Sequence, residues 1–346
     1  MNTITSYQHR RKSLTSLSYP YDHDHSSYYK LFLPNDPRPH GYMLPEVAKK
    51  MPWTSDFTLH HSHPLSITVK DTSNGTDTAN TINAAFSRLV SIAIDQDLFA
   101  IIHKQHSEPF AIPGANYSIP ISIERFASPL FGIINRGAHL TIYTYVSPSP
   151  SSSSSPPTVS EKPPSSSAKE LKIWVPRRSE TMFTYPNMLD STVAGGVRAT
   201  ETPYECILHE ADEEASLPAS IVHSSLKSVG CVTYMSLSST GSGGEHGLVV
   251  PDVLYTYDME LGEDQKPPEP RDEEVKEFYL LGVEEVKRAL GRGEFKPNSA
   301  VVMVDFLIRH GVVAYEEERD LVEIVARMHR RLPFPTASDV GSRVQA

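Results

Sequence analysis

The spacing of apolar residues changes along the chain between two periods, which predicts a fold of mixed helices and strands. In residues 78–96 apolar side chains recur every three or four positions, the period of a helix that covers a core. A shorter helix is predicted within 41–51. In residues 131–146 a bend leads into apolar and β-branched residues that suit a pleated surface, which predicts a strand. The carboxyl third is predicted to be helical, with segments at 283–290, 299–311 and 318–331.

Two low-complexity stretches each separate a pair of predicted strands. The Ser/Pro-rich residues 147–170 cannot bury a core. They form either a domain linker or a lengthened loop inside one sheet. We favour the loop, because strand-like segments at 141–146 and 171–179 would pair as a hairpin and doubling a loop costs only about 0.6 kcal/mol. The Gly/Ser-rich residues 238–247 join a second predicted hairpin.

The length of 346 residues suggests about two domains, at roughly 100–200 residues each. The predicted order is a disordered tail at 1–27, a smaller α+β domain at 28–125, a second domain at 131–335 that contains the insertion 147–170, and a tail at 336–346.

Composition narrows the class of function. The net charge of −10 argues against a nonspecific nucleic-acid binder, although a bound cation could still adapt a site to an anionic substrate. No apolar run approaches the roughly 20 residues of a membrane span, and the amino terminus lacks the apolar core of a secretory signal. Only Cys206 and Cys231 occur, which indicates a reducing compartment. We expect a cytoplasmic protein; the basic, Ser/Thr-rich start is also compatible with a mitochondrial presequence.

Residues 195–218 carry the densest negative charge, on a predicted helix. Thr202 is a capping residue, Pro203 suits the first helical position, and Glu205 completes a capping box. If the helix runs to about residue 215, three glutamates share one face with Cβ atoms about 5–6 Å apart: Glu210, Glu213 and Glu214. Such charges repel unless a hard cation such as Mg²⁺ or Mn²⁺ neutralises them. The alternative is a solvated acidic face, and the spacing alone leaves both open.

The register of the upstream residues favours the metal site. Five residues separate Gly195 from Glu201, seven more precede His209, and Glu210 follows directly. The stretch resembles the Nudix box, G-x5-E-x7-R-E-U-x-E-E-x-G-U, in which U is aliphatic. The matching positions are Gly195, Glu201, Glu210, Glu213, Glu214 and Leu217. The departures are His209 for arginine, Ala211 for an aliphatic residue and Ser216 for glycine.

The wider sequence is similar to one Nudix subgroup, which is fused to thiamine pyrophosphokinase in some fungi and free-standing in other fungi and in plants. The similar segments are 184–196, 207–218, 251–261 and 299–311. The resemblance implies an α/β/α sandwich with a mixed sheet, preceded by a smaller α+β domain. It also implies hydrolysis of a small-molecule diphosphate, in characterised members thiamine diphosphate or its oxidised forms, to the monophosphate and phosphate. A nucleoside diphosphate substrate and a weakly catalytic binding module are the alternatives.

The resemblance also implies roles for individual residues. Glu210, Glu213 and Glu214 would hold Mg²⁺ or Mn²⁺, with Glu201 joining through a water molecule. Glu213 is the expected general base, with Glu210 and Glu274 as further catalytic groups. For Glu274 the alternative is a solvated charge run in residues 271–281. His209 lacks the five-donor fork of the family arginine, which puts the full rate in doubt.

Substrate contacts are expected from glycines, arginines and aromatic rings. A turn at Gly195 and Gly196 would let the backbone approach the ligands and take positive φ. Arg177 and Arg178 follow a predicted strand and could reach phosphate oxygens, or could mark an exposed strand end. Trp174 and Tyr185 could stack on a substrate ring, with burial favoured for Trp174, and the amino-terminal domain is expected to form a specificity wall. The histidine-rich runs at 22–25 and 60–63 lack the pattern of a zinc site. Monomer and homodimer stay open.

Overall fold

The computed structural model describes residues 24–104, 106–147, 169–262 and 264–337. Most of the tails expected at 1–27 and 336–346, and of the insertion expected at 147–170, lies outside these ranges. No helix in the described ranges combines the length and apolar character needed to cross a membrane.

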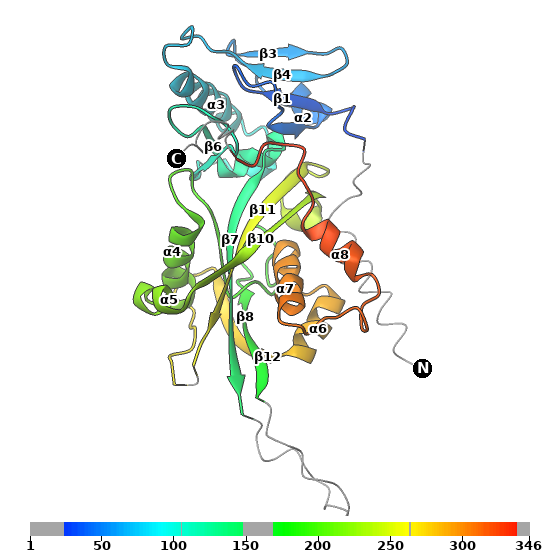
Figure 1. The fold of residues 1–346 in the computed structure, drawn as a ribbon. Helices are drawn as coiled ribbons and strands as arrows, with labels where there is room; N and C mark the ends of the chain where they lie inside the picture. The colour runs from blue at the N-terminus through cyan, green and yellow to red at the C-terminus, as the bar shows by residue number, and fades with distance from the viewer. Residues whose placement is uncertain (1–23, 105, 148–168, 263, 338–346) are drawn as a thin grey trace, which may run out of the picture.

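The amino-terminal part is built on a four-stranded sheet of order β2-β1-β4-β3 (Figure 1). Its strands are β1 (Tyr29–Phe32), β2 (Gly41–Met43), β3 (Phe57–His60) and β4 (Ser66–Val69), and only β1 and β4 run parallel. Around it lie α2 (Pro45–Lys50), α3 (Thr78–Asp95), the hairpin of β5 (Pro109–Ala111) and β6 (Ser122–Glu124), and the short 3-10 helices η1 (Ala100–Ile102) and η2 (Arg125–Phe131).

Helix α3 confirms the helix predicted from apolar spacing. Its apolar side chains at three- and four-residue intervals, including Ile82, Phe86 and Leu89, are fully buried. The core that they join continues past residue 125 to Ile133, and it also takes in Leu248 from the second half of the chain. The expected boundary at residue 125 therefore cuts through one hydrophobic core.

The second part is a mixed sheet of order β10-β11-β7-β8-β12, with the short β9 paired to β7. Its strands are β7 (Asn135–Val146), β8 (Glu170–Arg178), β9 (Val193–Gly196), β10 (Lys227–Leu237), β11 (Val249–Glu260) and β12 (Val275–Gly282). The pair β7–β11 is parallel and the other pairs are antiparallel. Both predicted hairpins, β7–β8 and β10–β11, are confirmed.

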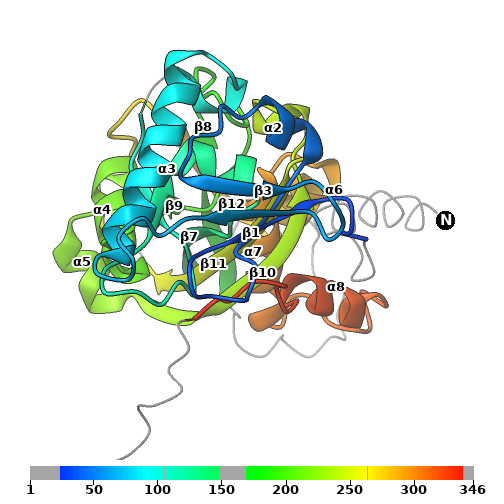
Figure 2. The ribbon, with the colours of Figure 1, turned by 90° about the horizontal axis from the view of Figure 1, so that it is seen from above.

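Helices cover both faces of this sheet. One side carries α4 (Pro203–Ala215) and α5 (Ala219–Ser225), and the other carries α6 (Val283–Arg292), α7 (Pro297–Arg309) and α8 (Leu321–Met328). Viewed from above, the amino-terminal sheet lies across the end of the long strands, with the two helical layers on either side (Figure 2). The α/β/α sandwich with a preceding α+β part is thus confirmed.

The carboxyl third is not wholly helical as expected, because it also contains strand β12. In the sequence, the acidic residues before this strand suggest a solvated charge run. In the structure, residues 275–282 pair antiparallel with β8. The strand lies at the edge of the sheet, so its exposed face tolerates charged residues that weaken the alternating pattern of a strand.

Candidate active site

Helix α4 begins as its sequence predicts. The Thr202 side chain accepts a hydrogen bond from the Glu205 amide at 3.2 Å, and the Glu205 carboxylate accepts one from the Thr202 amide at 2.9 Å. Pro203 occupies the first turn. Apolar side chains such as Ile207 and Ala211 are fully buried against the sheet. The helix is therefore fixed in rotation, which brings Glu210 and Glu214 against strand β9.

Gly195 and Gly196 are part of β9, and each makes room for a different side chain. A Cβ added to Gly195 would lie 2.3 Å from Glu210 Oε1, and one added to Gly196 would lie 2.3 Å from Phe110 Cζ. Neither glycine takes a positive φ, so the expected positive-φ turn is wrong. Glycine is needed here because a carboxyl group and an aromatic ring pack directly onto the two faces of the strand.

Two glutamates one helical turn apart are removed from water beside β9. Burial raises the pKa of Glu210 to about 7, and the charges of Glu213 and Glu274 add to the effect while Arg125 opposes it. Glu214 is buried, and its Oε2 accepts a hydrogen bond from the Ala194 amide at 3.1 Å. Burial, followed by the charge of Glu210, raises the pKa of Glu214 well above its usual range.

The other predicted acids lie near this pair and differ in how far they are exposed to solvent. Glu213 is exposed, and Glu274 stands just before β12, close enough for its charge to act on both buried glutamates. Glu201 Oε1 bonds to His209 Nδ1 at 2.6 Å, and Glu201 Oε2 accepts from the Arg198 amide at 3.4 Å. The ring of His209, which stands at the arginine position of the box, thus holds Glu201 in place.

A divalent cation suits this donor set by its chemistry. Burial raises the pKa of both Glu210 and Glu214, and the charge of Glu210 adds to the effect on Glu214, so a hard cation with oxygen ligands would stabilise both carboxylates. The described residues nevertheless contain no group of three histidine, cysteine or acidic side chains already arranged to hold a metal ion. Glu213 lies toward solvent and Glu214 is bonded to the backbone of β9, so these two side chains would have to turn to share a cation.

A cavity of about 250 Å³ lies on the other face of β9, where the amino-terminal part meets the sheet. Ala194, Gly195 and Gly196 form one side of it. Arg125 and Lys296 line it as well; the charge of Arg125 acts on Glu210, and the charge of Glu214 acts on Lys296. The cavity therefore lies close to these glutamates, but β9 separates it from Glu210 and none of the predicted site glutamates lines it.

The amino-terminal part contributes residues that sequence reasoning did not identify. Phe110, Arg125 and Phe126 line the cavity together with Phe183 and Tyr185 from the second part. Tyr185 is thus placed where a substrate ring could lie, whereas Trp174 packs partly buried in the core beneath α4. Local spacing contains no signal for the amino-terminal residues, because only tertiary packing brings them to β9.

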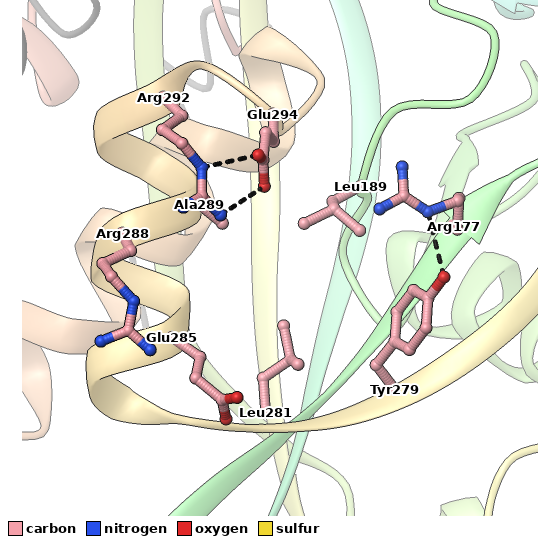
Figure 3. Close-up of a pocket in the computed structure, with 9 residues that line it drawn as sticks. All are labelled: Arg177, Leu189, Tyr279, Leu281, Glu285, Arg288, Ala289, Arg292 and Glu294. Atoms are coloured by element: carbon pink, nitrogen blue, oxygen red, sulfur yellow. Dashed lines mark hydrogen bonds and ion pairs between the residues drawn. The ribbon is translucent and has the colours of Figure 1, made fainter.

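The two arginines expected at phosphate lie elsewhere. Arg178 is buried, and its nitrogens donate to Asp190 Oδ2 at 2.8 Å, the Tyr185 carbonyl at 3.2 Å and the Thr184 carbonyl at 3.1 Å. These bonds hold residues 184–190 in place, so Arg178 has a structural role and the expected phosphate contact is wrong. Arg177 donates to the Tyr279 hydroxyl at 3.1 Å in a second cavity of about 340 Å³ beside α6 (Figure 3). Neither arginine lines the cavity beside the glutamates.

Both cysteines are free, and Cys206 is buried in the core under α4. Burial raises the pKa of its thiol, which fits packing rather than nucleophilic chemistry.

Comparison with known proteins finds similarity to a known domain family in the second part. The family profile described as "NUDIX domain" matches residues 166–300. The chain is 41% identical over 220 residues to the Saccharomyces cerevisiae "Uncharacterized protein YJR142W", covering 62% of this chain and 58% of that protein. It is 30% identical over 220 residues to "Nudix hydrolase 20, chloroplastic" of Arabidopsis thaliana, covering 63% and 50%. The match therefore spans little more than half the length of these relatives.

Solved structures include weaker likenesses. The NUDIX domain of Shewanella oneidensis NrtR, complexed with ADP ribose, has a TM-score of 0.34 at 12% identity and covers 51% of this chain and 88% of that one. A C. elegans Ap4A hydrolase binary complex has a TM-score of 0.32 at 14% identity, covering 51% and 98%.

Proposed function

We propose that the protein is a metal-dependent hydrolase of a diphosphate linkage, because residues 166–300 match the NUDIX domain profile. One observation carries the proposal. The box glutamates keep their register, and Glu210 and Glu214 lie against β9, which forms one wall of a cavity lined by cationic and aromatic side chains.

The proposal gives each acid a role. Glu210 and Glu214 hold the cation, Glu213 turns toward it from the exposed side of the same helix, and Glu201 joins through a water molecule. A bound Mg²⁺ or Mn²⁺ lowers the pKa of a coordinated water and neutralises charge on the diphosphate. Glu213 accepts the proton of the attacking water, and Glu274 adds negative charge just before the start of β12.

Thiamine diphosphate and its oxidised analogues are the substrates that we propose, with the monophosphate and phosphate as products. Two features support them: the four segments similar to the thiamine-associated subgroup, and a cavity whose aromatic residues can stack on a heterocycle. A nucleoside diphosphate derivative is the second candidate, because its base offers the same kind of ring. A binding module with little catalysis is disfavoured, since acids that repel one another are retained.

Phosphate release tests the proposal. Thiamine diphosphate, oxythiamine diphosphate and nucleoside diphosphates are incubated with Mg²⁺ and the full chain or its Glu213→Gln variant. We expect release from the thiamine compounds and a drop of about 100-fold or more in the variant. Asp212→Asn is the matched control, since Asp212 lies on the same helix but pairs with Arg271 at 2.5 Å.

The outcomes separate the alternatives. Release from nucleotides alone would keep the chemistry and replace the substrate. No release from any compound, by folded protein that binds Mg²⁺, would favour the binding module.

A further inference from the structure

A row of three polar side chains crosses the sheet at the cavity beside β9. Asp252 on β11 pairs in register with Asn135 on β7 and with Tyr234 on β10. Both neighbours are hydrogen-bonded to the Asp252 carboxyl group through their side chains. Tyr234 is buried, whereas Asn135 and Asp252 line the cavity. The carboxyl group is therefore held in place at the cavity wall by two fixed partners.

The amide of Asn135 is itself oriented. Its Oδ1 accepts a hydrogen bond from the Ser128 hydroxyl at 2.5 Å, so its amino group is the side that donates to Asp252. With Tyr234 donating from the other strand, the carboxyl group already has two donors. Its remaining lone pairs are available to a ligand in the cavity.

The other walls suit a flat ring. Phe110 and Phe126 come from the amino-terminal part, and Phe183 and Tyr185 come from the segment that Arg178 braces. Phe183 is 47% exposed, and the ring of His103 packs edge-on against it. Aromatic faces stack on heterocycles with little regard to their substituents, so discrimination between rings needs a polar group.

Asp252 is the acid that lines this cavity, among cationic side chains. Arg125, Arg136 and Lys296 line it as well, and Lys296 lies 3.5 Å from Asp190. The charge of Lys296 also acts on Asp252, where it lowers the pKa of the carboxyl group against the larger, raising effect of burial. A molecule that carries both an anionic diphosphate and a polar ring matches a cavity lined by several cations and one acid.

We propose that this cavity holds the ring of the diphosphate substrate and that Asp252 recognises an amino group on the edge of that ring. The inference deepens the function proposed above and rests on it. A carboxylate accepts hydrogen bonds from such an edge, whereas a carbonyl at the same position would face it lone pair to lone pair. Burial raises the pKa of Asp252 to about 7, which keeps part of the population ionised near neutral pH. Asp252 thereby sets the preference between amino- and oxo-substituted rings.

The test is equilibrium binding without divalent metal, so that no turnover intervenes. Two matched pairs of probes are used: thiamine and oxythiamine diphosphate, and cytidine and uridine diphosphate, each differing by an amino or oxo group on the ring. In Asp252→Asn we expect affinity for the amino member to fall about tenfold or more, because an ionic hydrogen bond is lost. Affinity for the oxo member should stay the same or increase, because the new amide can donate.

Two variants control for folding and for general loss of the cavity. Asp258→Asn alters an acid on the same strand that pairs with Arg309 and His310 outside the cavity, and it should leave the amino-to-oxo ratio unchanged. Phe183→Ala should weaken both members of a pair by a similar, severalfold amount.

Each outcome either supports or overturns the role proposed for Asp252. A ratio that moves only in Asp252→Asn supports the proposal, even where phosphate release shows that the thiamine compounds are not hydrolysed. A ratio unchanged in Asp252→Asn, or a wild-type protein that binds neither pair, overturns it.

Discussion

Single residues show how the chain accommodates its departures from the box. Ser216, at the box glycine, ends α4 with φ of 54° and ψ of 29°, a left-handed conformation. A side chain makes this conformation unfavourable by about 1–2 kcal/mol, whereas glycine adopts it readily. The preference for glycine at this box position is thus explained by the left-handed conformation that ends the helix, and the serine is tolerated at a modest cost in stability.

The variant Ser216→Gly should therefore be more stable than the wild type. We expect the free energy of unfolding to rise by about 1 kcal/mol, less the larger entropy that glycine gives the unfolded chain. Denaturant unfolding measures the change. Ser216→Ala keeps the Cβ atom and should show no gain; an equal gain in both variants would mean that the hydroxyl, not the backbone, is responsible.

A second residue-scale prediction concerns His139, which is buried with its Nδ1 2.9 Å from the Ser191 hydroxyl. Burial, followed by the charge of Lys296, lowers its pKa from 6.5 to about 4. Between these values the unfolded chain binds a proton that the folded chain does not, so stability falls as the pH falls from about 6.5 to about 4. The loss should be on the order of 3 kcal/mol.

His139→Gln removes this proton uptake. Unfolding free energies at about pH 7 and about pH 4.5 should differ less in the variant than in the wild type. Acids whose pKa is raised in the fold, such as Asp252, act in the opposite sense, but they are common to both proteins. Equal changes with pH in the two proteins would contradict the prediction.

At the scale of elements, local signals were sufficient for some segments and not for others. Helix α4 could be predicted to the residue, because its cap, its proline and its apolar period all lie within the segment. Strand β12 could not, since its pairing with β8 is decided by residues about a hundred positions away. The cavity joins Phe110 to Asp252, so no spacing within one segment could reveal it.

The capping box of α4 makes a testable contribution. Thr202→Ala removes the acceptor of the Glu205 amide and should lower the free energy of unfolding by about 1 kcal/mol. Thr202→Ser retains a hydroxyl and should lose much less. If thermal or denaturant unfolding gives the same loss for both, the methyl group rather than the cap would be the stabilising feature.

At the scale of the whole molecule, the two parts are joined by a shared hydrophobic core and by hydrogen bonds between Glu245 and η1. The amino-terminal core includes Ile133 and Leu248, so deleting residues 1–125 would expose apolar side chains rather than release a separate domain. The Glu245 carboxylate, between β10 and β11, accepts hydrogen bonds from the amides of Ala100 at 2.8 Å and Ile101 at 3.3 Å. It thereby holds η1 at the cavity, where Ile101 and His103 form part of the wall.

Removing the hydrogen bonds of Glu245 to η1 tests the role of the amino-terminal part without a deletion. Glu245→Ala leaves the amides of η1 without their acceptor, while the glutamates of α4 are untouched. If the amino-terminal part forms a wall for the substrate ring, KM should rise severalfold and kcat should change little, because binding rather than chemistry is weakened. Glu245→Gln keeps one acceptor oxygen and should lie in between, and Glu284→Ala, an exposed acid on α6, serves as the control. A fall in kcat at constant KM would instead mean that η1 positions the glutamates, since the loss would then fall on the transition state alone.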